Sequence, residues 1–127
     1  MANKTIMIVE DDVLHMKLFN DVLESRGYQT LRTTDADRTV PLARQHHPDL
    51  IIMDIQLPFI SGLELLKRLK DENDLEDIPV LADDWDEDEY LSYRFDAYLA
   101  KSIAISIFLN TVAGFFDPSP LEIHKCA

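Results

Sequence analysis

Three short apolar segments of this sequence each end at charged residues. Ile6 to Val9 is followed by Glu10, Asp11 and Asp12, Leu50 to Met53 by Asp54, and Ala97 to Ala100 by Lys101. Crowded carboxylates raise one another's pKa unless a cation offsets the repulsion, and Mg²⁺ suits hard oxygen ligands with room for water and a phosphate oxygen. An Asp in such a place can attack phosphorus, while a Lys contacts a second phosphate oxygen. If the fold brings these side chains together, their chemistry is phosphoryl transfer to a carboxylate.

A simpler interpretation exists for two of these acids. Asp11 and Asp12 precede a helical pattern and could cap it, and taken singly each is better explained in that way. Asp54, however, is followed by the loop "IQLPFISG" rather than directly by a helix, and capping gives Lys101 no role. The set as a whole therefore favours a cation and phosphate site.

The hydrophobic pattern predicts strands that alternate with helices. The predicted strands are Ile6 to Val9, Tyr28 to Arg32, Leu50 to Met53, Ile78 to Ala82 and Ala97 to Ala100. Four helices are predicted. The first carries Leu14, Leu18 and Val22 at helical spacing, with Phe19 and Leu23 beside them, and ends at Gly27; the second runs from about Asp35 to His46. The third begins at the capping box of Ser61 and Glu64 and buries Leu63, Leu66 and Leu69, and the fourth runs from Ile105 to Phe116. Pro41 should make the second helix start late or kink. This order is typical of a parallel sheet covered on both faces, whose ligand site lies outside the carboxyl ends of the strands.

Composition excludes several classes of function. The chain has 127 residues, enough for one domain, and a formal net charge of -12 from 12 basic and 24 acidic residues, which opposes binding to nucleic acid or anionic lipid. Cys126 is the single cysteine, so no internal disulfide forms, and the apolar run near the N-terminus is too short for a signal peptide or a membrane span. A cytoplasmic location is therefore expected. The sequence also lacks the glycine-rich motifs of dinucleotide and P-loop sites and the nucleophile elbow of hydrolases.

Four segments, "IMIVEDD", "PDLIIMDIQLPFISGLELLKRLK", "IPVLA" and "AYLAK", occur in an order that resembles the receiver domains of two-component response regulators. The segment "HMKLFNDVLESRGY" is especially similar to single-domain regulators of the DivK cell-cycle type. The resemblance covers roughly Lys4 to Phe116. It implies a flavodoxin-like α/β fold, (βα)5, with a doubly wound five-stranded parallel sheet of order 2-1-3-4-5, a receiver domain at 1–116 and a tail at 117–127.

The resemblance also implies a role for each matching residue. Asp54 would be the phosphoacceptor, Glu10, Asp11, Asp54 and the main-chain carbonyl of Gln56 would hold Mg²⁺, Lys101 would contact the phosphoryl group, and Tyr98 would be the aromatic switch. The phosphodonor would be a histidine kinase or phosphotransfer protein, and the output a downstream protein target. The chain would be a signalling phosphoacceptor that catalyses only its own phosphoryl transfer and slow dephosphorylation. A homodimer would use the face made by a shortened fourth helix, the last strand and the last helix.

The second half of the chain departs from the family pattern. Asp84 stands where the family has a Thr or Ser that bonds the phosphoryl group, Trp85 replaces a small residue, and Ser102 replaces the usual proline. An ionised Asp84 would repel phosphate by roughly 4 kcal/mol at about 4 Å and an effective dielectric near 20. Asp84 could instead face solvent, be protonated, or lie beside a gap in the match. If Asp84 is ionised and repels phosphate, a second hypothesis remains: the chain is an interaction adaptor that works independently of phosphorylation.

Two further features of the sequence each allow a functional interpretation. The acidic stretch from Asp84 could form a Ca²⁺ loop, but Glu89 stands where that loop needs Gly and Phe95 where it needs Glu, so we reject it. Phe115 and Phe116 could either extend an exposed apolar patch for a partner or complete the core, and the core is favoured.

Overall fold

The computed structural model of this chain describes residues 4–54, 62–85, 97–100 and 105–116. Its strands are β1 (Thr5–Val9), β2 (Gln29–Thr33), β3 (Leu50–Asp54), β4 (Val80–Trp85) and β5 (Ala97–Ala100). They form one sheet of order β2-β1-β3-β4-β5, and every neighbouring pair is parallel. The predicted doubly wound sheet and its strand order are confirmed.

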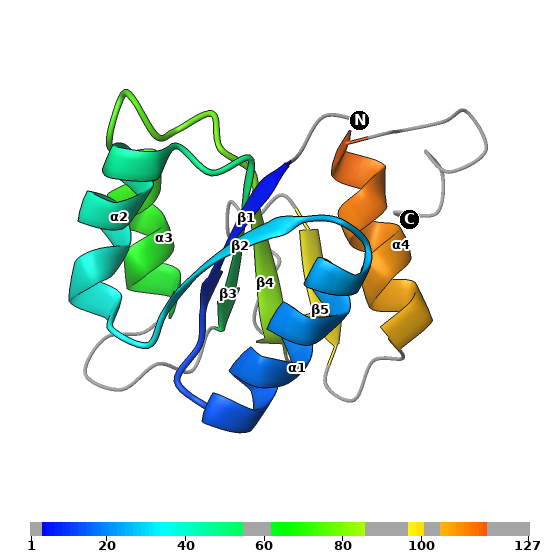
Figure 1. Cartoon of the computed structure of the whole chain (residues 1–127). Helices are drawn as coiled ribbons and strands as arrows, with labels where there is room; N and C mark the ends of the chain where they lie inside the picture. Colours follow the sequence, from blue (N-terminus) through cyan, green and yellow to red (C-terminus); the bar gives the residue numbers. More distant parts are fainter. Residues whose placement is uncertain (1–3, 55–61, 86–96, 101–104, 117–127) are drawn as a thin grey trace.

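Helices cover both faces of this sheet. They are α1 (Val13–Ser25), the short 3-10 helix η1 (Ala36–Arg38), α2 (Thr39–His46), α3 (Gly62–Lys70) and α4 (Ile105–Phe116). Figure 1 shows α1 and α4 on one side of the strands and α2 and α3 on the other. None of the helices in the described ranges is both long and apolar enough to cross a membrane.

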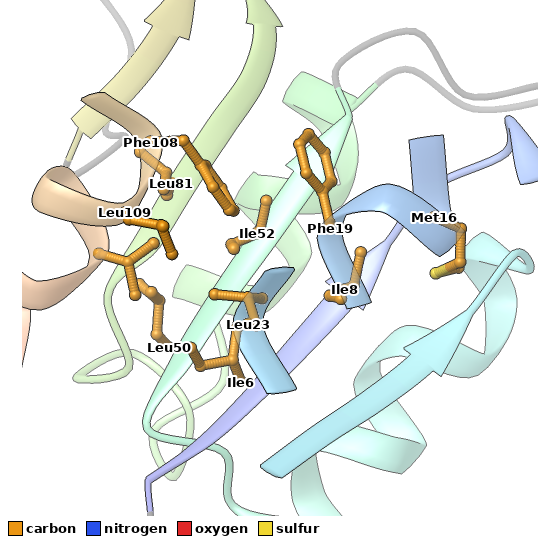
Figure 2. Packing of buried hydrophobic residues seen from close by; sticks show 11 residues of the cluster. Ile6, Ile8, Met16, Phe19, Leu23, Leu50, Ile52, Leu81, Phe108 and Leu109 are labelled. Atoms are coloured by element: carbon orange, nitrogen blue, oxygen red, sulfur yellow. The ribbon is translucent and has the colours of Figure 1, made fainter. Parts of the chain in front are cut away.

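The two faces of the sheet carry separate hydrophobic clusters. Under α1 and α4, Phe19 stacks on Phe108 with ring centroids 4.8 Å apart, above Ile8 and Ile52 of the central strands (Figure 2). The other cluster lies under α2 and α3 and includes Met7, Val9, Ile51 and Met53. Successive residues of β1 and β3 thus alternate between the two clusters, which explains why both strands are continuous apolar runs.

Helix α1 exists as predicted, but its buried row differs from the predicted pattern. Leu14 is 78% exposed and Leu18 is 41% exposed. The buried positions of this helix are Met16, Phe19, Asn20 and Leu23. Since rows at helical spacing run along both sides of this helix, spacing alone did not show which row faces the sheet. After the helix, Gly27 adopts a φ of 89°, a left-handed conformation that suits glycine and ends the helix as predicted.

The second strand and second helix follow the prediction closely. β2 begins one residue later than predicted, because the Tyr28 amide still donates to the Leu23 carbonyl at 3.2 Å in the turn after α1. The helix starts late, as Pro41 suggested, since α2 begins at Thr39 after η1 and Pro41 lies in its first turn, where proline is tolerated. It ends at His46, and the C-cap residue His47 has a φ of 47°.

The fourth strand differs more from its prediction. It was expected at Ile78 to Ala82 but runs from Val80 to Trp85. Its backbone pairs with β3 as far as Asp83, the register partner of Asp54, and Trp85 then pairs with Ala100 of β5. Acidic residues are poor strand formers, so the sequence pattern ended the strand too early. Between the pairs Ala82 with Tyr98 and Trp85 with Ala100, β4 advances one residue more than β5, which is the pattern of a β-bulge.

The remaining helices settle two predictions about packing. In α3, Leu66 and Leu69 are buried as predicted, and Leu65 is buried as well; Ser61 of the capping box and the side chain of Leu63 lie outside the described part. In α4, Phe115 and Phe116 are partly buried against the core, and the Phe116 ring lies 5.5 Å from that of Tyr28. These two phenylalanines therefore contribute to the core, the interpretation that the sequence favoured.

Candidate functional site

Two buried carboxylates lie side by side at the carboxyl edge of the sheet. Val9 of β1 and Met53 of β3 are register partners, and Glu10 and Asp54 are the next residue on each strand. Neighbouring strands are about 4.8 Å apart. Glu10 is 1% exposed and Asp54 is 6% exposed. The fold thus brings together the two acids from distant parts of the sequence that were predicted to share a site.

The Glu10 carboxylate is held by the start of α1. Its Oε2 accepts a hydrogen bond from the Asp12 amide at 3.2 Å, and its Oε1 lies 3.7 Å from Nδ1 of His15. The Glu10 amide donates to the Thr33 carbonyl at 3.2 Å, so the chain stays paired with β2 just beyond the strand. These contacts fix the position of the carboxylate at the edge of the sheet.

Sequence reasoning missed His15 as a neighbour of this site. The imidazole lies between Glu10 and Phe19, on whose ring it stacks with centroids 5.4 Å apart. The position of His15, five residues after Glu10, could have indicated this contact, because side chains in the first turn of a helix lie close to the end of the strand before it. The sequence, however, did not fix the rotation of α1.

The next two acids have different roles. The Asp12 Oδ1 accepts from the amides of Leu14 and His15 at 2.9 and 3.4 Å, so Asp12 caps α1, as the simpler interpretation of the sequence held. Asp11 is exposed and lies between this cap and Glu10. Its carboxylate is therefore accessible to a solvated cation at the rim of the site.

The acidic edge continues along the backbone of β4. Asp83 is the register partner of Asp54, and Asp84 is the next residue of the strand. Tyr98 of β5 aligns with Ala82, at the bulged part of this ladder. The backbone of Asp84 therefore lies at the end of the strand that neighbours Asp54. Gln56 and Lys101, which were also predicted as site residues, lie outside the described ranges, as do Cys126 and the expected shortened helix.

The donor set at this edge matches the preference of Mg²⁺. This ion is usually bound through one or two carboxylates and keeps several waters, which leaves positions for phosphate oxygens. Glu10 and Asp54 supply two buried carboxylates. In the described part of the chain, no three His, Cys, Asp or Glu side chains gather closely enough to form a metal cage. Two carboxylates with room for water suit a partly hydrated Mg²⁺.

Exposed apolar side chains lie near the same edge. They belong to the beginnings of α1 and α4 and to one further turn of α1: Val13, Leu14, Leu18, Ile105 and Ile107, with exposures of 71, 78, 41, 45 and 53%. The two helices cover the same face of the sheet and contact each other (Figure 1). Exposed apolar side chains on two neighbouring helices make this face a candidate surface for binding proteins.

The family model of the response regulator receiver domain matches residues 6–113. The chain therefore belongs to the response regulator receiver family of two-component signalling. It is also 46% identical over 117 residues to the polar-differentiation response regulator DivK of Brucella ovis, an alignment that covers 88% of this chain and 95% of that protein. The chain is thus a response regulator similar to DivK along nearly the whole DivK sequence, and the resemblance stated from the sequence is confirmed.

Solved structures agree with this assignment. The receiver domain of a signal transduction histidine kinase from Syntrophus aciditrophicus is 28% identical, has a TM-score of 0.80, and matches 88% of this chain and 89% of that chain. The receiver domain of the sensor histidine kinase PA1611 from Pseudomonas aeruginosa, solved with a magnesium ion in its active-site cleft, has a TM-score of 0.80. At 23% identity over 90% of this chain and 98% of that chain, it supports the fold.

Proposed function

We propose that this response regulator accepts a phosphoryl group on Asp54. The observation that carries the proposal is the pair of buried carboxylates, Glu10 and Asp54, at equivalent positions of neighbouring parallel strands. An oxygen of the Asp54 carboxylate attacks phosphorus, and the bond from phosphorus to a nitrogen of the donor imidazole breaks. Two carboxylates in one buried place repel each other, so this edge favours a cation.

The residues around Asp54 have different proposed roles. Glu10 and Asp54, with Asp11 at the rim and the main-chain carbonyl of Gln56, are proposed to hold Mg²⁺. When bound, this ion offsets the charge of the phosphoryl oxygens during transfer. Lys101 is proposed to contact a further phosphoryl oxygen, and Tyr98 to report the state of the site as the aromatic switch.

The proposed partners are a histidine kinase or phosphotransfer protein as donor and a downstream protein as target. The exposed apolar side chains at the beginnings of α1 and α4, the ends of these helices nearest the acidic edge, support docking of a protein donor. We propose that the chain acts in the cytoplasm and catalyses only its own phosphoryl transfer and slow dephosphorylation. The comparisons favour this response regulator over the phosphorylation-independent adaptor.

Titration with Mg²⁺ and beryllofluoride, a mimic of the phosphoryl group, tests the proposal by NMR. Mg²⁺ alone should shift the Glu10 and Asp54 amides, and a further saturable shift is expected when beryllofluoride is added in the presence of Mg²⁺. Asp54→Asn should remove the response to beryllofluoride, because an amide lacks the attacking carboxylate oxygen. A response that survives in Asp54→Asn would place the acceptor elsewhere.

A further inference from the structure

A second polar site opens at the end of β2, outside the acidic edge. It is a groove of about 550 Å³ between α1 and the loop that leads into η1, and its lining residues are Met16, Arg32, Thr33, Thr34, Asp35 and Arg38. Its volume lies within the range of small-molecule sites, about 300 to 1,000 Å³. Figure 2 shows Met16 at the edge of the α1 cluster, away from Phe108. The groove is thus lined by one apolar residue, Met16, and by polar residues.

The charges on this groove are unusual for the molecule. The chain carries a formal charge of -12, yet two arginines, Arg32 and Arg38, line the same opening. Elsewhere, Arg44 pairs with Glu72 and Asp74, and Arg68 pairs with Glu64. Across the described residues, neither Arg32 nor Arg38 forms an ion pair. The pKa of Asp21 is lowered mainly by its hydrogen bond with Lys17 and least by the charge of Arg32. Two exposed guanidinium forks are therefore available to an anion.

The wall between the two arginines is preorganised. The Asp35 amide donates to the Thr33 hydroxyl at 3.0 Å, and that hydroxyl donates to the Asp35 carbonyl at 3.2 Å. The Asp35 Oδ1 in turn accepts from the Asp37 amide at 2.9 Å. A wall already held by its own hydrogen bonds loses little conformational entropy when a ligand binds.

We propose that this groove binds a phosphate-bearing small molecule that also carries hydroxyl or amino donors, as a nucleotide does. Arg32 and Arg38 engage the phosphate, because the planar guanidinium fork matches two phosphate oxygens at once. The Asp35 carboxylate, which would repel a bare anion, instead accepts a hydrogen bond from a donor on the rest of the ligand. Met16 packs against its apolar part. This site is separate from Asp54 and does not depend on phosphorylation there.

The groove also adjoins the acidic edge through the backbone. Thr33 is the register partner of Val9, and its carbonyl accepts the hydrogen bond from the Glu10 amide. The Glu10 amide should therefore sense a ligand in the groove, although the ligand does not touch Glu10.

NMR titration of the full chain with AMP tests this site, without Mg²⁺ so that the Asp54 edge does not take part. Saturable shifts of Thr33, Thr34 and Asp35 are expected below about 10 mM AMP. Arg32→Gln and Arg38→Gln should each weaken binding at least tenfold, while Arg26→Gln, which removes an exposed guanidinium outside the groove, should not. Arg32→Lys should weaken it as well, since an ammonium keeps the charge but lacks the fork. Circular dichroism of each variant confirms that it is folded.

Three probes separate the contributions of the ligand. Adenosine, which lacks the phosphate, should not bind, and inorganic phosphate should bind more weakly than AMP. Equal binding of adenosine and AMP would overturn the role of the arginines, and equal binding of phosphate and AMP would overturn that of Asp35. Absence of any saturable shift with AMP, or saturation only by a glutamate-rich peptide, would overturn the small-molecule site itself.

Discussion

Glu10 and Asp54 occupy equivalent positions on neighbouring parallel strands, each one residue beyond the register pair of Val9 and Met53. Both side chains are buried, at 1% and 6% exposure. Like charges placed in one buried region repel each other, and a bound cation offsets that repulsion. The relationship links the sheet topology directly to the proposed chemistry.

Replacing Glu10 with Gln tests the proposed metal site. Glu10→Gln should weaken Mg²⁺ binding at least tenfold, roughly 1.4 kcal/mol, because a charged ligand is lost. The fluorescence of Trp85, the single tryptophan, offers a readout, since Asp84 beside it lies at the end of the strand next to Asp54. The control is Asp12→Asn, which removes a nearby charge and keeps a good helix cap. Unchanged Mg²⁺ affinity in Glu10→Gln would exclude Glu10 as a ligand.

The same variant should change stability in opposite directions with and without the metal. In EDTA, Glu10→Gln should raise the melting temperature, since one of two neighbouring buried charges is removed. With saturating Mg²⁺, the original chain should be the more stable of the two, because the ion stabilises the folded state that binds it. A variant less stable than the original chain in EDTA would show that repulsion between the acids is not what the metal relieves.

Much of the fold followed from the sequence, and the errors have physical causes. The apolar runs of β1 and β3 predicted a covered parallel sheet, because both faces of these strands are buried. The exposed row of Leu14 and Leu18 could not be told from the buried row, since the rotation of α1 depends on its cap and on the strand beneath it. β4 extends to Trp85 through backbone pairing with β3 as far as Asp83 and with β5 at Trp85, which a side-chain pattern does not report.

The site could be predicted only in part from the sequence. Strand ends are visible in the sequence, so Glu10 and Asp54 were identified and the topology then placed them together. His15 was missed, because its contact with Glu10 depends on how the helix is rotated. The groove at Arg32 and Arg38 was missed too, since neither residue follows a recognisable motif and only the path of the loop brings them to one opening.

Stability should depend on the inner row of α1 and not on its outer row. Phe19→Ala removes a buried ring stacked on Phe108 and should lower the free energy of unfolding by about 3 to 5 kcal/mol. Leu18→Ala, one residue away but 41% exposed, should change it by less than about 1 kcal/mol. Urea denaturation measures both. Equal losses in the two variants would mean that the rotation assigned to α1 is wrong.

The exposed apolar residues should affect the rate of phosphotransfer from a protein donor but not from a small-molecule donor. Leu14→Ala should leave folding and phosphorylation by acetyl phosphate unchanged, because the side chain is 78% exposed. It should slow phosphotransfer from the cognate histidine kinase several-fold, since a hydrophobic contact in the docked complex is lost. Time courses of phosphorylation, quenched at intervals, give the rate with each donor. The docking proposal fails if both donors are affected alike, or if neither is.

Asp84 should limit the response to phosphorylation. In the original chain, beryllofluoride is expected to shift amides around Asp54 and to move Tyr98 little, because an ionised Asp84 opposes the phosphate by roughly 4 kcal/mol at about 4 Å. Asp84→Thr should extend the shifts to Tyr98, whereas the control Asp71→Asn, which removes an acid in the turn after α3, should not. If Tyr98 already shifts fully in the original chain, Asp84 imposes no such penalty.

The most direct test of the account is the mass of the intact protein after incubation with acetyl phosphate and Mg²⁺. The account predicts the gain of one phosphoryl group, its absence in EDTA, and its absence in Asp54→Asn, with Asp49→Asn as a control that loses an exposed acid and keeps the gain. A phosphoryl group that appears in Asp54→Asn, or no gain in the original chain with either acetyl phosphate or a competent histidine kinase, would contradict it.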